Sequence, residues 1–395
     1  MKVFQINSVC GIRSTGRICT DIADILKEQG HECRIAYGRE TVPEKYRDTA
    51  DRIGSDFGVK INALKARLLD NEGFNAKQAT EKLVALMKDY NPDVIHLHNI
   101  HGYYLNLPEL FTYLASANKP VVWTLHDCWA FTGHCSYFDF IGCDKWRTGC
   151  VRCPQKKAYP ASYLADCSMS NWKKKKDLFT SVQNMTLVTP SEWLAGLVKQ
   201  SFLGKYPVKV IRNGVDTTVF KPTYGNFRNA NHLENQKIVL GVASVWDKRK
   251  GLDDFIKLSE MLDSTYSVVL VGISEKQKRR LPEGIIGITR TNNTTQLAEI
   301  YTAADVFVNP TYEDNYPTVN LEAQACGTPV ITYNTGGSPE SVNADAVVAK
   351  GNLNGILALI KTCNTLGVRT LPEKKEQYNE YLILYNTLNN KIGYR

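Results

Sequence analysis

The chain alternates short apolar runs with helical patterns, breaks off once, and then alternates again. Apolar strand-length runs between helical patterns are typical of parallel sheets whose two faces are both covered by helices. The interruption is the polar, unpatterned stretch 224–235, which has the composition of a linker. The strands predicted before it are 2–7, 32–38, 93–98, 120–126, 185–190 and 208–214, and those after it are 237–244, 266–272, 285–290, 305–310 and 328–333.

Two domains fit the 395 residues better than one. We expect an N-terminal domain over 1–222 and a C-terminal domain over 223–372. Both are predicted to be α/β, with a doubly wound, Rossmann-like parallel sheet. A last helix is predicted within 373–395.

The segment 309–340 is the most informative part of the second predicted domain. Pro317 suits the first position of a helix, where the missing N–H costs no hydrogen bond. Gly327 suits the left-handed position just past a helix end, and Pro329 prevents the helix from continuing. The pattern therefore predicts a short helix over 318–326, whose N-terminus offers N–H groups to an anion.

Two carboxylates flank that predicted anion site. Asp314 lies in the loop before the helix, and Glu322 follows on the same helix face as Thr318. Helix N–H groups suit a phosphate, and carboxylates suit sugar hydroxyls. The combination indicates a nucleotide-sugar pocket.

The segment resembles the E-x7-E motif of the retaining family 4 glycosyltransferases, which have the GT-B fold. Aligned on Glu322, the first acid of the motif falls on Asp314, where the family usually has Glu. Glu313 is the alternative first acid if the alignment slips by one residue. The resemblance covers nearly the whole chain. It implies two Rossmann-like domains facing across a cleft, with the helix at 373–395 packing back onto the first domain.

The resemblance also implies roles for single residues of the donor site. In the family the first acid contacts the donor sugar and the second contacts the nucleotide ribose, so Asp314 and Glu322 receive these roles. The start of the helix is expected to supply further donor contacts from Pro317, Thr318 and Val319. No metal or other cofactor is implied for catalysis.

A basic loop follows the first strand of the second domain. Its sequence, SVWDKRKGLDD (244–254), resembles the family's phosphate-binding Arg/Lys loop, with Lys250 beside Gly251 in the expected place. The family's Arg position is Val245 here, so Arg249 or the following helix start is expected to supply the missing charge. Two cations on a diphosphate would stabilise the leaving group as its negative charge grows.

The first domain places histidines at predicted strand ends, where ligands of open α/β sheets bind. His126, in TLHD (124–127), matches the family histidine that contacts the donor sugar. Asp127 is expected to orient His126 or to reach an acceptor hydroxyl. The run HLHNIH (96–101) is interpreted as acceptor-side strand-end and loop residues, with His98 as the candidate. Metal ligation is the alternative, but no carboxylate accompanies the run at ligand spacing.

Glycine-containing turns complete the family pattern. The sequence IRNGVDTTVF (211–220) resembles the family's domain-junction motif, and Gly336, Gly337 and Glu340 resemble its GG-x-x-E loop. The first loop of the chain lacks the G-x-G-x-x-G dinucleotide pattern. Gly16 at a helix start would nevertheless let a phosphate or an acceptor approach closely.

Four of the eleven cysteines cluster as Cys135, Cys143, Cys150 and Cys153. Four thiolates at the spacing C-x7-C-x6-C-x2-C can close a tetrahedral zinc site. Only one C-x2-C pair is present, so structural zinc and four reduced thiols stay open as alternatives. His134 is a candidate replacement ligand. A disulfide framework is not expected in a cytosolic chain.

The net charge of +8 suits an anionic donor, an anionic lipid surface or a nucleic acid. The clearest basic run, 173–176, is either a solubilising helix face or a peripheral contact with anionic membrane. No apolar run approaches the ~18 residues of a membrane-spanning helix, and the N-terminus lacks the apolar core of a signal peptide. We therefore expect a cytoplasmic protein, with peripheral contact to the inner face of the plasma membrane as an option.

These features together predict a hexosyltransferase-type enzyme. By resemblance to enzymes of bacterial capsule and exopolysaccharide assembly, it would move a sugar from a nucleotide diphosphate sugar to a hydroxyl of a lipid-linked glycan, with retention of the anomeric configuration. No nucleic-acid partner is expected, because aromatic residues do not interleave with basic ones along a strand platform. The alternatives are a nucleotide-sugar epimerase or hydrolase on the same fold, and a non-catalytic nucleic-acid or membrane-binding protein.

Overall fold

The computed structural model describes residues 1–393, with side chains up to residue 390. The chain forms two compact units, with Met1–Arg212 and Lys375–Arg395 in unit 1 and Asn213–Lys374 in unit 2. The boundary predicted at residue 222 lies ten residues too late, because the chain from Asn213 onward belongs to unit 2. The side-chain Nδ2 of Asn213 donates a hydrogen bond to the Tyr316 carbonyl of that unit at 3.2 Å. Residues 394 and 395 of the predicted last helix lie outside the described residues.

Unit 1 contains a seven-stranded sheet in the order β3-β2-β1-β4-β5-β6-β7. Its neighbouring strands pair in parallel. The strand order reverses between β1 and β4, and ligands of such sheets bind outside the carboxyl ends at this switch point. The strands are β1 Lys2–Asn7, β2 Glu32–Tyr37, β3 Ala50–Arg52, β4 Val94–Leu97, β5 Val121–Thr124, β6 Met185–Thr189 and β7 Val208–Val210.

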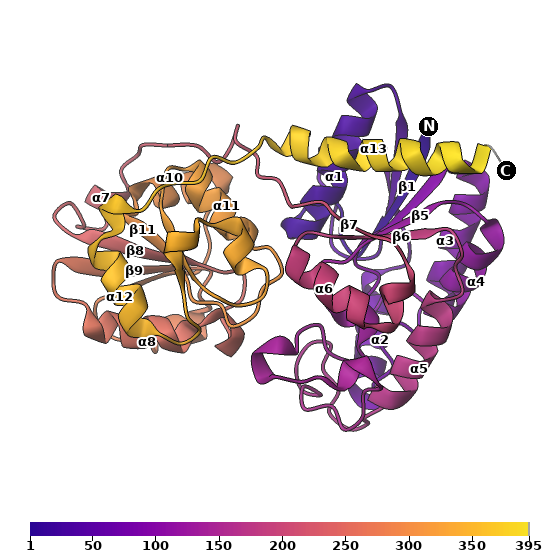
Figure 1. Cartoon of the computed structure of the whole chain (residues 1–395), viewed down its shortest axis with the longest axis horizontal. Coiled ribbons are helices and arrows are strands. Elements are labelled where there is room, and N and C mark those ends of the chain that lie inside the picture. Colours follow the sequence, from indigo (N-terminus) through magenta and orange to yellow (C-terminus); the bar gives the residue numbers. More distant parts are fainter. Residues whose placement is uncertain (394–395) are drawn as a thin grey trace. The chain divides into compact units, whose positions relative to one another are not determined.

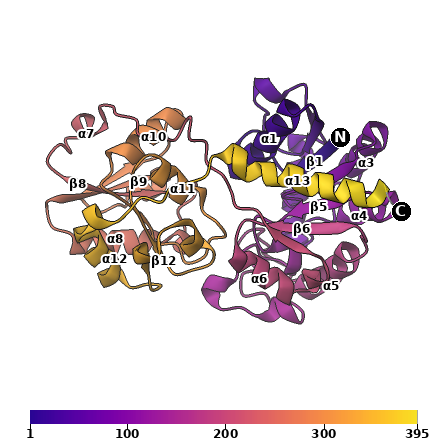
Figure 2. The ribbon, with the colours of Figure 1, turned by 45° about the horizontal axis from the view of Figure 1, so that its top comes forward.

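Helices cover both faces of this sheet. On one face, Ile22 of α1 and Tyr381 and Tyr385 of α13 share a core with Val3 of β1, and Figures 1 and 2 show α13 crossing the sheet beside α1. The other face carries the larger, aromatic-rich core. In the described residues, no helix is long and apolar enough to cross a membrane. The helices of this unit are α1 Arg13–Glu28, α2 Asp56–Leu69, α3 Lys77–Tyr90, α4 Leu107–Ala117, α5 Ser168–Phe179, α6 Glu192–Gln200 and α13 Lys374–Gly393.

Unit 2 contains six parallel strands in the order β10-β9-β8-β11-β12-β13. Its switch point lies between β8 and β11, so the loops that follow these two strands meet at one edge of the sheet. The strands are β8 Lys237–Val242, β9 Tyr266–Val271, β10 Ile285–Ile288, β11 Val306–Asn309, β12 Val330–Tyr333 and β13 Val347–Val348. The helices are α7 Phe227–Ala230, α8 Leu252–Met261, α9 Glu275–Lys278, α10 Thr294–Ala303, α11 Thr318–Ala325 and α12 Leu353–Lys361.

Some element boundaries differ from the sequence prediction. The edge strands β3 and β13 have only three and two residues, which is too short for an apolar pattern. Pro317 is the N-cap of α11 and not its first helical residue, because its ψ of 117° is still extended. Gly327 has the predicted left-handed conformation, with φ at 87°.

Candidate functional site

The loops after β8 and β11 bring the predicted cation and acid of unit 2 into contact. Lys250 Nζ donates a hydrogen bond to Asp314 Oδ2 at 2.5 Å. Arg249 Nη1 donates to the backbone carbonyl of Glu313 at 2.7 Å. The Asp247 carboxylate accepts from Lys250 N at 3.0 Å and so caps the basic turn. The sequence motif therefore folds into a loop that holds two cations beside the acidic loop.

Of the two adjacent acids, Asp314 is the one that a ligand can reach. Glu313 is fully buried, whereas the Asp314 side chain keeps 15% of its surface exposed. Burial alone would raise the pKa of Asp314, but Lys250 and Arg249 outweigh it and hold that pKa below its ordinary value. Asp314 is therefore ionised at neutral pH, and the alignment that uses it is favoured over the one that uses Glu313.

Gly336 has a structural reason to be glycine. A Cβ atom there would lie 2.1 Å from the Asp314 carbonyl oxygen, and Gly337 N donates to the same oxygen at 2.9 Å. Thr335 Oγ1 donates to the Thr311 carbonyl at 2.5 Å. The glycine loop after β12 thus holds the Asp314 loop in place.

Glu322 lies in the second turn of α11, on its buried side. Its Oε2 accepts a hydrogen bond from the Tyr301 hydroxyl at 3.1 Å. The helix begins directly after the Asp314 loop, and the half-buried Thr318 and Val319 form its first turn. Unit 2 therefore brings the loop acid, the two cations and a helix N-terminus to one edge of its sheet.

In unit 1, His126 follows β5 and contacts a second histidine. His98 Nδ1 lies 3.1 Å from His126 Nε2, and His98 Nε2 lies 2.9 Å from Gln5 Oε1. Burial lowers the pKa of His126 to about 4, so its imidazole is neutral at physiological pH. The His98 ring is buried behind His126, and both residues line a small cavity with Asp127, so an acceptor-side role of His98 stays a prediction.

Asp127 follows His126 and bonds to His101 and to the backbone. Its Oδ2 lies 2.9 Å from His101 Nε2, and its Oδ1 accepts from Trp129 N at 2.9 Å. The bond to the residue two positions on turns the carboxylate toward His101. His101 Nδ1 in turn lies 3.1 Å from the Tyr159 hydroxyl. Asp127 and His101 therefore form a separate pair, which the sequence pattern alone does not indicate.

Gly16 does not make room for a ligand. It lies inside α1, which begins at Arg13, and a Cβ atom there would lie 3.1 Å from Val9 Cγ2 and 3.2 Å from Gly11 N. The space that its missing side chain leaves is taken by the chain's own first loop. The prediction of a close ligand approach at this glycine is wrong for that reason.

The basic run on α5 is interrupted by a buried lysine. Lys175 is buried, donates to the carbonyls of Trp129 and Thr132 at 2.9 and 3.2 Å, and lies 3.3 Å from the Trp129 ring centroid. Lys173 and Lys174 are exposed. The predicted continuous patch over 173–176 is therefore wrong, because one of its charges is used inside unit 1.

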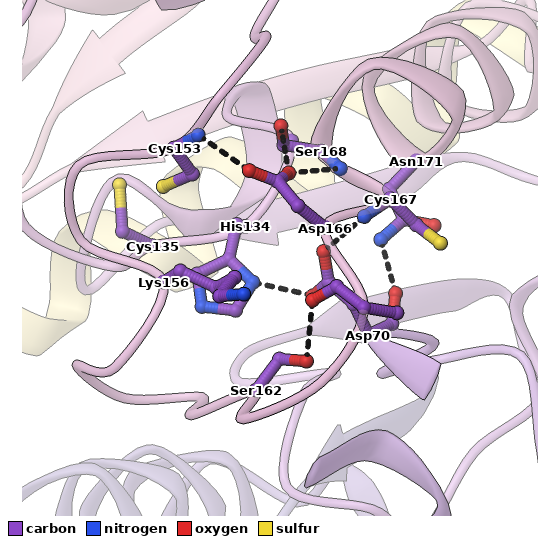
Figure 3. A network of polar contacts seen from close by, with 12 residues as sticks. Asp70, His134, Cys135, Cys153, Lys156, Ser162, Asp166, Cys167, Ser168 and Asn171 are labelled. Carbon is purple, nitrogen blue, oxygen red and sulfur yellow. Dashed lines mark hydrogen bonds and ion pairs between the residues drawn. The ribbon is translucent and has the colours of Figure 1, made fainter. Parts of the chain in front are cut away.

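The four clustered cysteines line one small cavity. Figure 3 shows Cys135 and Cys153 beside the buried pair of His134 and Asp70, whose Nδ1 and Oδ1 atoms are 2.5 Å apart. His134 Nε2 is buried without a hydrogen-bond partner. A carboxylate on one ring nitrogen and an unsatisfied second nitrogen is the usual state of a histidine ligand. In residues 1–390, however, no three His, Cys, Asp or Glu side chains are arranged to hold a metal, so zinc stays a prediction.

Unit 1 also has a cavity of about 530 Å³ between α2 and the start of α3. Asn62 of α2, Lys77 and Lys82 of α3 and the loop residue Tyr103 are among the residues that line it. Asn62 Nδ2 donates to the Tyr103 carbonyl at 3.1 Å, which ties α2 to the loop that follows β4. Lys77 Nζ pairs with Glu81 at 3.8 Å and Lys82 Nζ donates to the Arg52 carbonyl at 3.1 Å, so the cavity is partly polar in its lining.

Comparison with known proteins assigns most of the chain. The family described as Glycosyltransferase Family 4 matches residues 15–219, and the family described as Glycosyl transferases group 1 matches residues 225–362. WcaC of Escherichia coli K12, named as a candidate glycosyl transferase of colanic acid biosynthesis, is 25% identical over 369 residues. This match covers 86% of this chain and 85% of WcaC.

Solved structures share the fold at low sequence identity. Sucrose-phosphate synthase from Thermosynechococcus elongatus is 16% identical with a TM-score of 0.67, and the match covers 99% of this chain and 97% of that one. Anabaena HepE in complex with UDP is 14% identical with a TM-score of 0.61, and the match covers 99% and 98%. The chain therefore belongs to glycosyltransferase family 4 and is a glycosyltransferase with the GT-B fold.

Proposed function

We propose that this glycosyltransferase takes its sugar from a nucleotide diphosphate sugar. The observation that carries the proposal is the contact between Lys250 and Asp314 at the switch point of unit 2. A cation there suits a diphosphate, and a carboxylate beside it suits a sugar hydroxyl. Anabaena HepE, which shares the fold, is solved in complex with UDP and with UDP-glucose, and this supports the donor class.

Within unit 2 the donor is assigned group by group. Lys250 and Arg249 hold the diphosphate and stabilise it as negative charge grows on the leaving group. The N–H groups at the start of α11 face the same anion. Asp314 accepts from hydroxyls of the sugar, and Glu322 accepts from the ribose. No metal or cofactor is assigned to the chemical step.

In unit 1, His126 is assigned to the sugar of the donor. Burial lowers its pKa and keeps the imidazole neutral, so the ring can accept a hydrogen bond from a sugar hydroxyl without adding positive charge. A neutral ring positions the sugar without competing with Arg249 and Lys250 for the diphosphate. Retention of the anomeric configuration follows the family resemblance.

The acceptor is proposed to be a hydroxyl of a lipid-linked glycan in bacterial surface polysaccharide synthesis. The name of WcaC, which places that protein in colanic acid biosynthesis, supports this role. The cavity that Asn62, Lys77 and Lys82 line in unit 1 is the candidate acceptor site, because its size and partly polar lining suit part of a glycan.

A thermal-shift screen across nucleoside diphosphates tests the donor class. The matching nucleotide at 100 times its dissociation constant should stabilise the chain by about 2.7 kcal/mol. Product analysis with the matching nucleotide sugar, with and without a glycan acceptor, then tests the reaction. Sugar release or epimerisation without any transfer would assign the chain to hydrolysis or epimerisation, and no stabilisation by any nucleotide would contradict the donor proposal.

A further inference from the structure

Helix α2 exposes a continuous apolar stripe. Phe57, Ile61, Leu64 and Leu68 follow one another at intervals of four, three and four residues, which places all four on one side of the helix. Their exposed fractions are 74%, 38%, 56% and 39%. The opposite side of the helix is held by unit 1, since Ala66 is buried and Val59 packs against the main core. The stripe is therefore a surface, and not a part of the core.

Basic side chains border this stripe on both sides. Around the helix axis, Lys60 and Arg67 lie next to Leu64 on one side, and Lys65 lies next to Ile61 on the other. All three are exposed, and among the described residues no ion pair joins any of them to a carboxylate. Asp56, at the start of the helix, is paired with Arg52. The stripe is thus flanked by cations whose charge is available to a partner.

A neighbouring loop extends the same surface at the end of α2. Tyr163 N donates to the Arg67 carbonyl at 2.7 Å, and Ala165 N donates to the Leu68 carbonyl at 3.1 Å. Leu164 between them is 71% exposed. Lys156 Nζ donates to the Leu164 carbonyl at 3.2 Å and adds a further cation beside this end.

We propose that the α2 stripe, with its flanking Lys60, Lys65 and Arg67, docks unit 1 on an anionic lipid bilayer. A helix of 14 residues is only about 21 Å long, and it would lie in the plane of the interface with its apolar side chains among the acyl chains. The long stems of the lysines and the arginine reach from the helix to the anionic headgroups. Membrane docking goes beyond the proposed reaction. It rests on that reaction in one respect, since the docked enzyme would gain access to a lipid-linked acceptor.

The charge pattern favours a lipid surface over a second copy of the chain. Two identical stripes packed against each other would bring six α2 cations close together. The only α2 carboxylates would be the two Asp56 side chains, which are already paired with Arg52. Anionic headgroups instead complement the cations, so each exposed Lys or Arg of α2 adds to the attraction. The chain's net charge of +8 acts in the same direction.

The position of α2 links docking to the candidate acceptor site. Gly58, Val59 and Asn62 on the side of α2 away from the stripe line the 530 Å³ cavity, together with Lys77 and Lys82. A bilayer against the stripe therefore brings lipid headgroups to within one helix diameter of this cavity, about 10 Å. A glycan whose lipid anchor stays in the bilayer can reach the cavity from there.

Vesicle flotation tests the proposal with matched variants. The full chain should float with vesicles of phosphatidylcholine and phosphatidylglycerol and much less with phosphatidylcholine alone. Leu64→Ser with Leu68→Ser should weaken this binding by roughly tenfold or more. Ile383→Ser is the matched control, because Ile383 of α13 is 57% exposed against 56% for Leu64, and it should bind as the unmodified chain does.

A second pair of variants separates α2 from the basic run on α5. Lys60→Glu with Lys65→Glu should weaken binding to the anionic vesicles by roughly tenfold or more, whereas Lys173→Glu with Lys174→Glu makes the same charge change and should not. The opposite result would overturn the assignment to α2, and so would an unmodified chain that floats with neither vesicle. A dimer in solution that Leu64→Ser with Leu68→Ser dissociates would make a second copy the occupant. Nucleotide binding, measured in the same samples, tests the proposed donor independently of all these outcomes.

Discussion

His98 stands directly behind His126, with 3.1 Å between His98 Nδ1 and His126 Nε2. The hydrogen bonds of Gln5 assign the protons: Gln5 Nε2 donates to the Cys19 carbonyl at 2.9 Å, so Gln5 Oε1 accepts from His98 Nε2. A neutral His98 then accepts at Nδ1, and His126 must donate from its Nε2. The chain of bonds fixes His126 as the Nε2–H tautomer, with Nδ1 unprotonated.

Replacing His98 should therefore disturb His126 without touching the nucleotide. His98→Ala leaves the buried N–H donor of His126 without its acceptor, so the imidazole is no longer held in place and turnover should fall roughly five- to a hundredfold. The unsatisfied donor should also lower the free energy of unfolding by about 1–3 kcal/mol. His98→Gln should restore most of the turnover, because its amide oxygen can accept from His126 while its amide nitrogen donates to Gln5. Turnover, nucleotide affinity and the ¹⁵N signals of His126 are the measurements. If His98→Ala changes the His126 tautomer but leaves turnover unchanged, the proposed positioning of His126 by His98 is wrong.

The same histidines should make the fold sensitive to mild acid. Burial lowers the pKa of His96, His98 and His126, the last to about 4. In the unfolded chain they bind protons near their ordinary pKa of about 6.5, so below that pH the unfolded state holds more protons. The free energy of unfolding should therefore decrease as pH falls from about 6.5 towards 4.

Urea unfolding at a series of pH values checks this window. His126→Gln removes one of the three groups, so the decrease between about pH 6.5 and pH 4 should become shallower. His232→Gln, in unit 2 and outside this buried cluster, is the control and should leave the slope unchanged. An identical slope in His126→Gln would mean that this histidine is not held neutral in the folded state.

The bonded series Gln5–His98–His126 also marks the limit of what the sequence could predict. Strand-end position and a family motif are local signals, and they placed His126, Lys250 and Asp314 in the loops where the structure has them. The partner of His98 lies 93 residues away in β1, and no periodicity relates two positions at that separation. Side-chain bonds across neighbouring strands depend on strand order, which an apolar pattern does not specify.

Lys175 is a different case, because the sequence held a signal that could have placed it. Trp172, Lys175 and Phe179 are three and four residues apart, so they share one side of α5, and all three are buried. The charge run 173–176 suggests one basic surface. On a helix, however, Lys175 lies on the side of Trp172 and Phe179, which faces the core.

Glu322→Gln should weaken nucleotide binding while the fold survives. A glutamine can still accept from the Tyr301 hydroxyl, which lies 3.1 Å from the present carboxylate. The charged acceptor proposed for the ribose is lost, and hydrogen bonds to charged groups contribute about 1.5–3 kcal/mol. Titration calorimetry with the nucleoside diphosphate measures the change, with thermal unfolding as the check on the fold. Equal affinity in the variant would remove Glu322 from the ribose site.

The cysteine cluster is predicted to carry about one zinc ion per chain. Metal analysis of protein purified without added zinc measures the content, and a chelator should lower the unfolding temperature more than it alters turnover. Cys150→Ser should lose the metal, whereas Cys363→Ser, a buried cysteine of unit 2 outside the cluster, should keep it. Protein without stoichiometric metal and with all four thiols open to titration would leave the cluster as packing.

Lys250 and His126 should divide their effects between the two parts of the donor. Lys250→Ala removes a cation from the diphosphate, so affinity for the bare nucleoside diphosphate should fall by roughly ten- to a hundredfold. Lys248→Ala, an exposed neighbour in the same loop, should not change it. His126→Ala should keep the affinity for the bare nucleotide and lose one to three orders of magnitude in turnover, about 1.4–4 kcal/mol, because its proposed partner is the sugar. Calorimetry on the three variants tests the proposed orientation of the donor. If His126→Ala loses nucleotide affinity and Lys250→Ala keeps it, that orientation is wrong.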